Sequence, residues 1–316
     1  MDPTGGPVRL ILMDNYPRDQ HGIVYRRTAL SVGWSDYLLN QGVKRGELTK
    51  IWAGAFAVGD HTPSELYRLR SIAASTLTEG NVLSHQSAAS VHGLAMLLPD
   101  LSKVHTTSGA KAGKISARRH LHPGYLDASE VVVVDGVAVT SPARTAADVA
   151  CGASDFAQAL AVMDSALRNG VTADDIAEIL DGTRAGVGIA RRALAFADAG
   201  SENPGESWGR AQMICAGLPV PRLQQEFHGA DGRFVARCDY TWCGRLVGEF
   251  DGMVKYQKYV RTGETPFDVV RREKAREDAL RKLDVMVIRW VWDDLLTDRV
   301  VPLVADWLRR LGLSAA

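Results

Sequence analysis

The chain has 316 residues, a length that favours two or three domains over a single hydrophobic core. Its content of 46% hydrophobic and 23% charged residues is ordinary for a globular protein and excludes a chain that is disordered throughout. Because 37 basic residues balance 37 acidic ones, net charge neither supports nor excludes a nucleic-acid partner, and local patches decide that question.

The sequence has no feature of a membrane or secreted protein. No apolar run approaches the roughly 20 residues that cross a bilayer, and the N-terminus lacks the pattern of a secretion signal. We therefore expect a soluble, cytoplasmic protein with no membrane partner. The cysteines are too scattered to complete a zinc site of paired cysteines, and we interpret them as reduced and buried. They are Cys151, Cys215, Cys238 and Cys243.

Residues 1–20 predict a loosely held lead-in, and residues 21–60 predict a helix-turn-helix followed by a strand pair. The helical stretch YRRTALSV is followed by Gly33, by SDYLLNQGVKRGEL and by the strand-like IWAGAFAVG. Gly33 permits a tight turn, and Ser35 is a good N-cap for the second helix. This order predicts a winged helix-turn-helix.

A winged helix-turn-helix places its second helix in the major groove of DNA, while nearby basic residues meet phosphates. The alternative interpretation is a small helical cap with a solvated charged edge. The residues expected near the bases are Trp34, Ser35, Asp36, Tyr37 and Asn40, and those expected near phosphates are Lys44, Arg45 and Lys50.

Residues 61–200 predict a central region of helices and strands. One helix begins at TPSE, and another contains His85 and His92, a pair that indicates packing rather than metal binding because no third ligand is evident. The basic stretch that ends in ARRHLH contains Arg118 and Arg119. It predicts either a second nucleic-acid contact or a solvated loop.

The stretch RFVARCDYTWCGRLVGEFDGMVK predicts a β-hairpin with acidic side chains where a hydrophobic strand tolerates few. The acids are Asp239, Glu249 and Asp251. Burying ionised carboxylates is costly unless a cation or hydrogen bonds compensate. Their convergence predicts a site for a divalent metal such as Mg²⁺ or Mn²⁺.

Two segments of the first half carry a family resemblance. The sequence SHQSAASVHGL, followed by VTSPARTAADVA, resembles actinobacterial proteins grouped with AbiEi-type antitoxins, over roughly residues 20–170. The resemblance implies an N-terminal winged helix that binds DNA. It also implies a repressor of a toxin operon, with a cognate toxin as partner.

The second half, from SENPGESWGRAQMICAGLP to RWVWDDL, resembles the very-short-patch-repair type of the PD-(D/E)XK nuclease superfamily. This resemblance implies a restriction-endonuclease-like αβββαβ core in residues 201–316 and metal-dependent hydrolysis of phosphodiester bonds. The predicted elements are a helix at 206–217, strands at 223–228, 234–241 and 246–251, a helix at 266–283 and a strand at 285–291.

The resemblance also implies roles for single residues. Glu206 matches the acid of the first helix, Asp239 the acid of the second strand, and Glu249 the acid of the third. The family pattern has lysine two residues after that last acid, where this chain has Asp251, so Lys255 is the nearest candidate for the catalytic cation. Lys274 on the following helix is the second candidate.

Structural explanations of these acids stay open beside the catalytic one. Glu206 fits an acid in the first turn of a helix, favoured by the helix dipole. Asp239 can pair with Arg237 or Arg245 on a strand surface. The EFDG sequence around Glu249 also fits a strand that runs into a turn.

We thus expect a multi-domain α+β protein, and three hypotheses for its function. The first is a Mg-dependent endonuclease to which the winged helix delivers DNA. The second is an AbiEi-type antitoxin or repressor whose nuclease-like domain is inactive and serves for homodimerisation or toxin contact. The third is a scaffold without a nucleic-acid role.

Overall fold

The computed structural model describes residues 16–78, 80–109, 112–252 and 265–313. The chain divides into an N-terminal unit, residues 1–94 and 99–148, and a C-terminal unit, residues 95–98 and 149–316. The boundaries predicted at residues 20, 60 and 200 fall inside these units and stay predictions. Among the described helices, none is long and apolar enough to cross a membrane.

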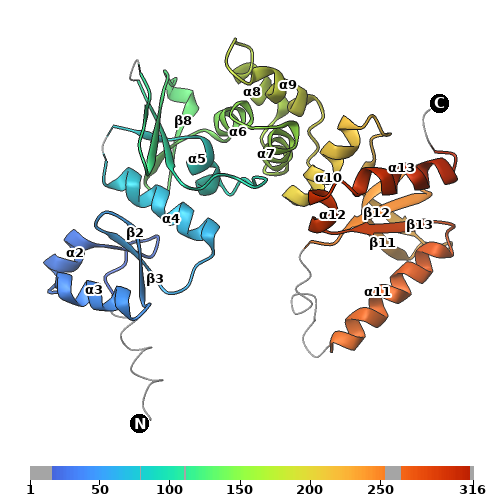
Figure 1. Ribbon diagram of the computed structural model, residues 1–316, viewed down its shortest axis with the longest axis horizontal. Coiled ribbons are helices and arrows are strands. Elements are labelled where there is room, and N and C mark those ends of the chain that lie inside the picture. The colour runs from blue at the N-terminus through green and yellow to red at the C-terminus, as the bar shows by residue number, and fades with distance from the viewer. Residues whose placement is uncertain (1–15, 79, 110–111, 253–264, 314–316) are drawn as a thin grey trace, which may run out of the picture. The chain divides into compact units, whose positions relative to one another are not determined.

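The N-terminal unit begins with a small antiparallel sheet and two short helices (Figure 1). Gly33, with φ of 93°, turns the chain between the helices, and the Ser35 side chain caps the second helix by accepting the N–H of Leu38, both as predicted. The strand order is β1-β3-β2. The elements are β1 (Ile23–Tyr25), α2 (Arg26–Ser31), α3 (Asp36–Lys44), β2 (Leu48–Trp52) and β3 (Ala55–Val58).

Helix α4 (Pro63–Thr76) packs between this small sheet and a larger mixed sheet of the same unit (Figure 1). Thr62 and Glu65 form a capping box that begins the helix, as TPSE predicted. Buried Ile51 of the small sheet, Ile72 of α4 and Val139 of the large sheet belong to one hydrophobic core. The N-terminal unit is therefore held together by a core that both sheets share.

The larger sheet has six strands in the order β6-β7-β5-β4-β9-β8. Its strands β5 and β7 pair in parallel although they come from either side of a basic loop. The elements are β4 (Val82–Leu83), α5 (His85–His92), β5 (Val104–Ser108), β6 (Lys114–Ile115), β7 (Arg119–Pro123), the 3-10 helix η1 (Ala128–Glu130), β8 (Val131–Val134) and β9 (Val137–Thr140). Helix α6 (Pro142–Cys151) spans the residue at which the two units divide.

The C-terminal unit combines helices with a four-stranded sheet in the order β10-β11-β12-β13, of which only the last pair is parallel. The order helix, three strands, helix, strand agrees with the predicted order, while membership of a nuclease family stays a prediction. The elements are α7 (Phe156–Arg168), α8 (Ala173–Ile179), α9 (Val187–Ala195), α10 (Pro204–Cys215), β10 (Arg222–His228), β11 (Phe234–Trp242), β12 (Leu246–Phe250), α11 (Pro266–Arg281), β13 (Met286–Trp290), α12 (Trp292–Leu296) and α13 (Val300–Arg310).

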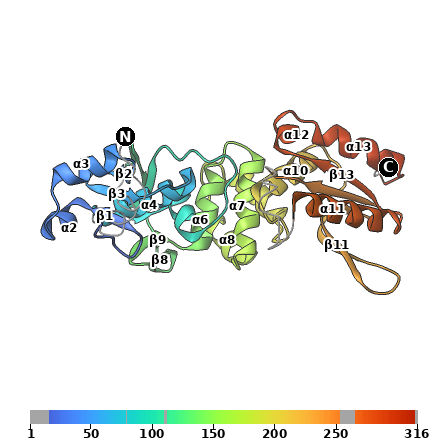
Figure 2. The same ribbon diagram turned by 90° about the horizontal axis from the view of Figure 1, so that it is seen from below.

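Two hydrophobic clusters attach helices to this sheet. Met213 of α10 and Leu308 of α13 join Trp290 in one cluster, whereas Leu280 of α11 joins Val247 in the other. Helices α12 and α13 are on one side of the sheet in Figure 1 and α11 is on the other, and Figure 2 gives a second view. The sheet is thus covered by helices, and its strand ends are the places where polar groups can gather.

Position 248 on β12 requires glycine, because the ring of Trp290 packs closely against its backbone. A Cβ atom there would lie 2.4 Å from the ring of Trp290, so any side chain would displace this buried tryptophan of the core. The cysteines are free thiols, but the predicted burial holds only for Cys238, because Cys215 and Cys243 are exposed and Cys151 is partly exposed. Cys215 is the last residue of α10, and Cys243 lies in the turn after β11, where side chains point to solvent.

Candidate functional site

Three predicted catalytic acids of the C-terminal unit interact with one another. Glu206, only 5% exposed, lies in the first turn of α10, Asp239 on β11 and buried Glu249 on β12. Burial, reinforced by the charge of Asp239, raises the pKa of Glu206 to about 8. Burial also raises the pKa of Asp239 to about 6, and the charge of Glu249 adds to this effect. The structure thus brings together acids that are far apart in sequence.

Each of these carboxyl groups also accepts hydrogen bonds from the protein. Glu206 accepts the backbone N–H of Glu202 at 2.7 Å and the side-chain amide of Asn203 at 2.5 Å. Asp239 accepts the backbone N–H of Phe250 at 2.9 Å. These bonds compensate for part of the cost of burial without a metal ion.

The cation next to Glu249 is Arg276 of α11, which donates to its Oε2 at 2.5 Å. Sequence reasoning considered Lys274 and Lys255 and missed this residue; Lys274 is exposed, and Lys255 lies outside the described residues. A usable signal was present, because Arg276 is one helical turn before buried Leu280 and therefore on the same face of α11.

Asp251 is at the position where the nuclease pattern has lysine. It does not form a tight ligand cluster with the other acids that the structure describes. Its side chain is nearly half exposed, and Arg289 of β13 lies 4.0 Å away. Within the described ranges, no three acids place ligand atoms within 4.8 Å of one another. Glu249 Oε1 is buried without a hydrogen-bond donor of normal geometry, although the Cys238 thiol interacts with the same carboxylate. The donor set therefore fits a divalent metal only in part.

The predicted DNA-reading residues divide into two groups. Ser35 caps α3, Asp36 pairs with Arg26 at 2.5 Å, and Arg45 pairs with buried Glu47 at 3.0 Å, so these side chains have structural partners. Trp34 stacks on Tyr16 with 4.7 Å between ring centroids. The other predicted residues are exposed and share the surface of α3 and β2: Tyr37, Asn40, Lys44 and Lys50.

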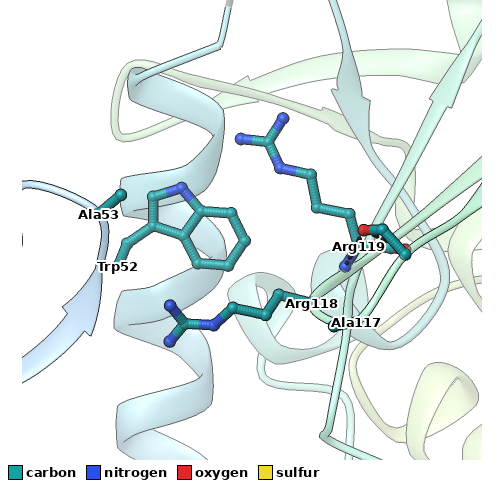
Figure 3. A pocket seen from close by; sticks show the side chains of 6 residues that line it. Trp52, Ala53, Ala117, Arg118 and Arg119 are labelled. Carbon is teal, nitrogen blue, oxygen red and sulfur yellow. Dashed lines mark hydrogen bonds between the residues drawn. The ribbon is translucent and has the colours of Figure 1, made fainter.

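Arg118 and Arg119 lie beside the hairpin of β2 and β3. Their guanidinium carbons are 5.2 Å and 5.0 Å from the ring centre of Trp52. Together with Ala53 and Ser116 they line a cavity of about 430 Å³ (Figure 3). Two cationic groups at one cavity suit an anionic group such as phosphate.

A cluster of histidines in the N-terminal unit was missed by sequence reasoning. His105 Nδ1 and His122 Nε2 are 2.9 Å apart, and the rings of His120 and His122 stack with centroids 3.8 Å apart. The ligand atoms of these three residues all lie within 4.8 Å of one another. Their approach follows from the parallel pairing of β5 with β7, where His105 is opposite His120. The signal was the alternating His-x-His of a strand, but its partner strand was not predictable.

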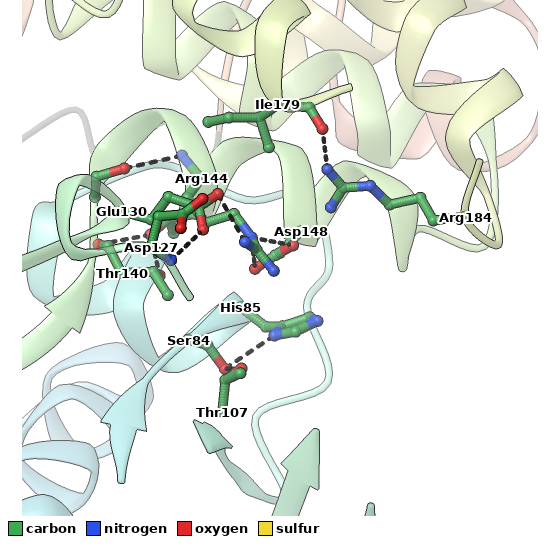
Figure 4. Close-up of polar contacts among 12 residues, drawn as sticks. Ser84, His85, Thr107, Asp127, Glu130, Thr140, Arg144, Asp148, Ile179 and Arg184 are labelled. Atoms are coloured by element: carbon green, nitrogen blue, oxygen red, sulfur yellow. Dashed lines mark hydrogen bonds and ion pairs between the residues drawn. The ribbon is translucent and has the colours of Figure 1, made fainter. Parts of the chain in front are cut away.

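His85, at the start of α5, completes this cluster. Its ring stacks on His122 with centroids 3.6 Å apart, and its Nδ1 is 3.0 Å from Ser84 Oγ, which accepts a bond from Thr107 (Figure 4). Burial lowers the pKa of His105 to about 4 and that of His122 to about 3, and the neighbouring His120 adds to both shifts. These rings are neutral at pH 7.

The TSPARTAADVA segment has a structural explanation within the N-terminal unit. Arg144 donates to Glu130 at 2.7 Å and to Asp148 at 2.9 Å (Figure 4). His92 lies outside the histidine cluster and contacts the carbonyl of Thr140 at 2.7 Å, in agreement with the predicted packing role. This motif therefore joins α6 to the edge of the sheet.

Comparison with known proteins places a family match on the middle of the chain. Residues 81–194 match the AbiEi antitoxin C-terminal domain. Two proteins of Mycobacterium tuberculosis, the uncharacterized proteins MT2308 of strain CDC 1551 and Rv2248 of strain H37Rv, are each 28% identical to this chain over 298 residues. The aligned region covers 87% of this chain and 98% of each relative. The match supports an antitoxin-like identity, and it ends before α10.

Proposed function

We propose that the protein is a DNA-binding regulator of the AbiEi antitoxin type, which represses an operon that encodes it together with a cognate toxin. The match of residues 81–194 to an antitoxin domain supports this assignment. The resemblance to AbiEi-type antitoxins implies an N-terminal winged helix that binds DNA, and we assign this role to residues 21–60.

The observation that carries the proposal is the exposed surface of α3 and β2. Tyr37 is 69% exposed at the start of a capped helix, and Asn40 and Lys44 follow on that helix. An Asn side chain can form paired hydrogen bonds with adenine, and lysines contact phosphates. Lys50 on the hairpin adds a second phosphate contact, and Arg118 and Arg119 add a third cationic position.

The C-terminal unit serves, in this proposal, as a surface for homodimerisation or toxin contact rather than for cleavage. Arg276 occupies one oxygen of Glu249, and Asp251 replaces the lysine that would stabilise negative charge during hydrolysis. The exposed aromatic side chains of Phe234 and Phe267 suit a protein contact better than a catalytic cleft.

Fluorescence anisotropy with duplex DNA from upstream of the protein's own gene tests this function. The Lys44→Ala, Lys50→Ala double variant is expected to bind about 10-fold more weakly and to lower the salt dependence by roughly two released counterions. Lys282→Ala, which removes an exposed lysine of the C-terminal unit, is the matched control. Equal affinity of the double variant and the wild type would refute the assigned surface.

A second candidate function is Mg²⁺- or Mn²⁺-dependent DNA cleavage. The raised pKa values of Glu206 and Asp239 favour it, because a divalent cation would relieve the repulsion among these acids and the neighbouring Glu249. Incubation of supercoiled and linear DNA with either metal tests it. Cleavage that disappears in an Asp239→Ala, Glu249→Ala variant would establish the enzyme over the non-cutting regulator.

A further inference from the structure

We propose that His105, His120 and His122 form a binding site for one zinc ion in the N-terminal unit. This site lies outside both the acids of the C-terminal unit and the exposed surface of α3. It goes beyond the proposed regulatory function and does not depend on it.

The geometry of the ring nitrogens supports a shared metal ion. Zinc is bound by histidine nitrogens at about 2.0–2.1 Å in tetrahedral sites, which places two ligand nitrogens roughly 3.3 Å apart. The His105 Nδ1 to His122 Nε2 distance is 2.9 Å, and the ligand atoms of all three residues lie within 4.8 Å of one another. Side-chain rotations that separate the stacked rings of His120 and His122 would bring the three nitrogens around one ion.

The fold supplies these ligands from a rigid element. His105 is on β5, and His120 and His122 are on β7, which pairs with β5 in parallel over five residue pairs. His120 and His122 are two residues apart, so they project from the same face of their strand. The strand pairing therefore brings three half-buried imidazoles to one face of the sheet.

His85 positions this group without being counted among the ligands. Its ring stacks on His122 at an interplanar angle of 13°, and its backbone has φ of 50°, a conformation that non-glycine residues rarely adopt. Such strained residues gather at functional sites, where the surrounding structure holds them in place. Ser84 Oγ contacts Nδ1 of this ring at 3.0 Å, and Thr107 donates a hydrogen bond to the same Oγ.

The chemistry of the donor set selects the class of metal. Neutral imidazole suits zinc and other late divalent transition metals, whereas Mg²⁺ and Ca²⁺ prefer oxygen ligands. Three histidines leave a further coordination position for water or another ligand. An ion held here would fasten β7 to β5 and so fix the strand that carries Arg119 beside Trp52.

The test uses the full chain freed of any purification tag, stripped with EDTA and then dialysed against zinc chloride. Metal analysis should find one zinc per wild-type chain, and the melting temperature should rise by roughly 5 °C or more. His120→Gln and His122→Gln should each lose the zinc and the rise, while melting like the wild type in EDTA. His61→Gln, which removes a histidine of the same unit outside the cluster, should keep both.

A second measurement does not depend on variants. X-ray absorption of the zinc-loaded wild type should show a first shell of nitrogen and oxygen at about 2.0 Å with the scattering pattern of imidazole. The proposal is overturned if the chain retains no zinc, if the two glutamine variants retain it fully, or if it is lost instead in an Asp239→Asn, Glu249→Gln variant. DNA affinity is measured separately, so failure of this site leaves the regulatory function standing.

Discussion

The histidine cluster (His85, His105, His120 and His122) and the carboxylate cluster (Glu206, Asp239 and Glu249) are both groups of buried ionisable side chains, but they differ in the hydrogen-bond donors that the rest of the protein supplies. The histidines lose their charge, because burial and mutual proximity lower the pKa of His105 and His122. Burial likewise favours the neutral forms of Glu206 and Asp239 by raising their pKa values, but the acids also recruit donors, such as Arg276 and the backbone N–H groups next to Glu206 and Asp239. Neutral imidazoles keep lone pairs for a metal, whereas carboxylates already bound by the protein have fewer to offer.

The largest predicted change in unfolding free energy concerns α10, the helix that carries Glu206. Arg210 of α10 pairs with Asp164 of α7 at 2.5 Å, and both side chains are buried. Arg210→Met leaves a buried charge without its partner, and we expect the C-terminal unit to lose about 3–5 kcal/mol of unfolding free energy. Hydrogen exchange should show the loss in α7 and α10, with β5 and β7 unchanged.

Arg309→Met is the control for this prediction, since Arg309 is an exposed arginine of the same unit. It should change the unfolding free energy by less than about 0.5 kcal/mol. If Arg210→Met is equally mild, the pair does not hold α10 in place.

The next largest effect of a substitution tests whether Arg276 replaces a metal ion at Glu249. Arg276→Met should lower the unfolding free energy by about 2 kcal/mol, because a buried carboxylate loses its charged donor. The same variant should bind Mn²⁺ more tightly than the wild type in calorimetry, since the carboxylate is released. Arg271→Met, on an exposed position of the same helix, should change neither quantity.

The acids also predict a pH dependence of the C-terminal unit. The folded pKa of Glu206 is about 8 and that of Asp239 about 6, both above their unfolded values, so folding retains protons that the unfolded chain releases. Stability is therefore fully present below the unfolded pKa and is lost as the pH rises through the folded value. In EDTA, the loss of unfolding free energy between pH 5 and pH 8 should be roughly 3–5 kcal/mol, most of it from Glu206.

Chemical denaturation at each pH measures how steeply the unfolding free energy falls as the pH rises. The Glu206→Gln variant should show a weaker dependence on pH. Glu226→Gln, at an exposed position of β10, should leave the slope as in the wild type. A stability that rises from pH 5 to pH 8 because of Glu206 would contradict the described burial.

The smallest predicted effect is a pH dependence of stability in the N-terminal unit, with the opposite sign to that of the C-terminal unit. His105 and His122 have folded pKa values below the unfolded value, so the unfolded chain binds protons that the folded chain does not. Stability is lost as the pH falls below about 6.5, by about 1 kcal/mol down to pH 5 after allowance for solvent screening. The charge of Lys103 lowers the pKa of His105, and the charge of Asp100 raises it. The charge of Arg144 lowers the pKa of His85.

His122→Asn should reduce this acid-side slope in EDTA, measured by hydrogen exchange of peptides from β5 and β7. His228→Asn, which removes an exposed histidine of the C-terminal unit, serves as the control. An unchanged slope in His122→Asn would show that the cluster is not buried in solution.

The carboxylate cluster could be predicted from the sequence, whereas the histidine cluster could not. The acids were predicted because Asp239 and Glu249 stand out in apolar strands, and the capping signals at Ser35 and Thr62 located helix starts. The histidines were not, because β5 and β7 pair across a loop, and no local pattern specifies which strands become neighbours. Arg276 was missed for the same reason, since the partner of a helix face depends on tertiary packing.

The most direct test of the regulatory account combines binding and cleavage in one assay. End-labelled duplex DNA from upstream of the gene is mixed with the wild-type chain in EDTA, Mg²⁺ or Mn²⁺, and the products are separated under native and denaturing conditions. The account predicts a shifted complex whose DNA stays intact with every metal. Cut DNA in Mg²⁺ or Mn²⁺, abolished by Asp239→Ala with Glu249→Ala, would contradict it.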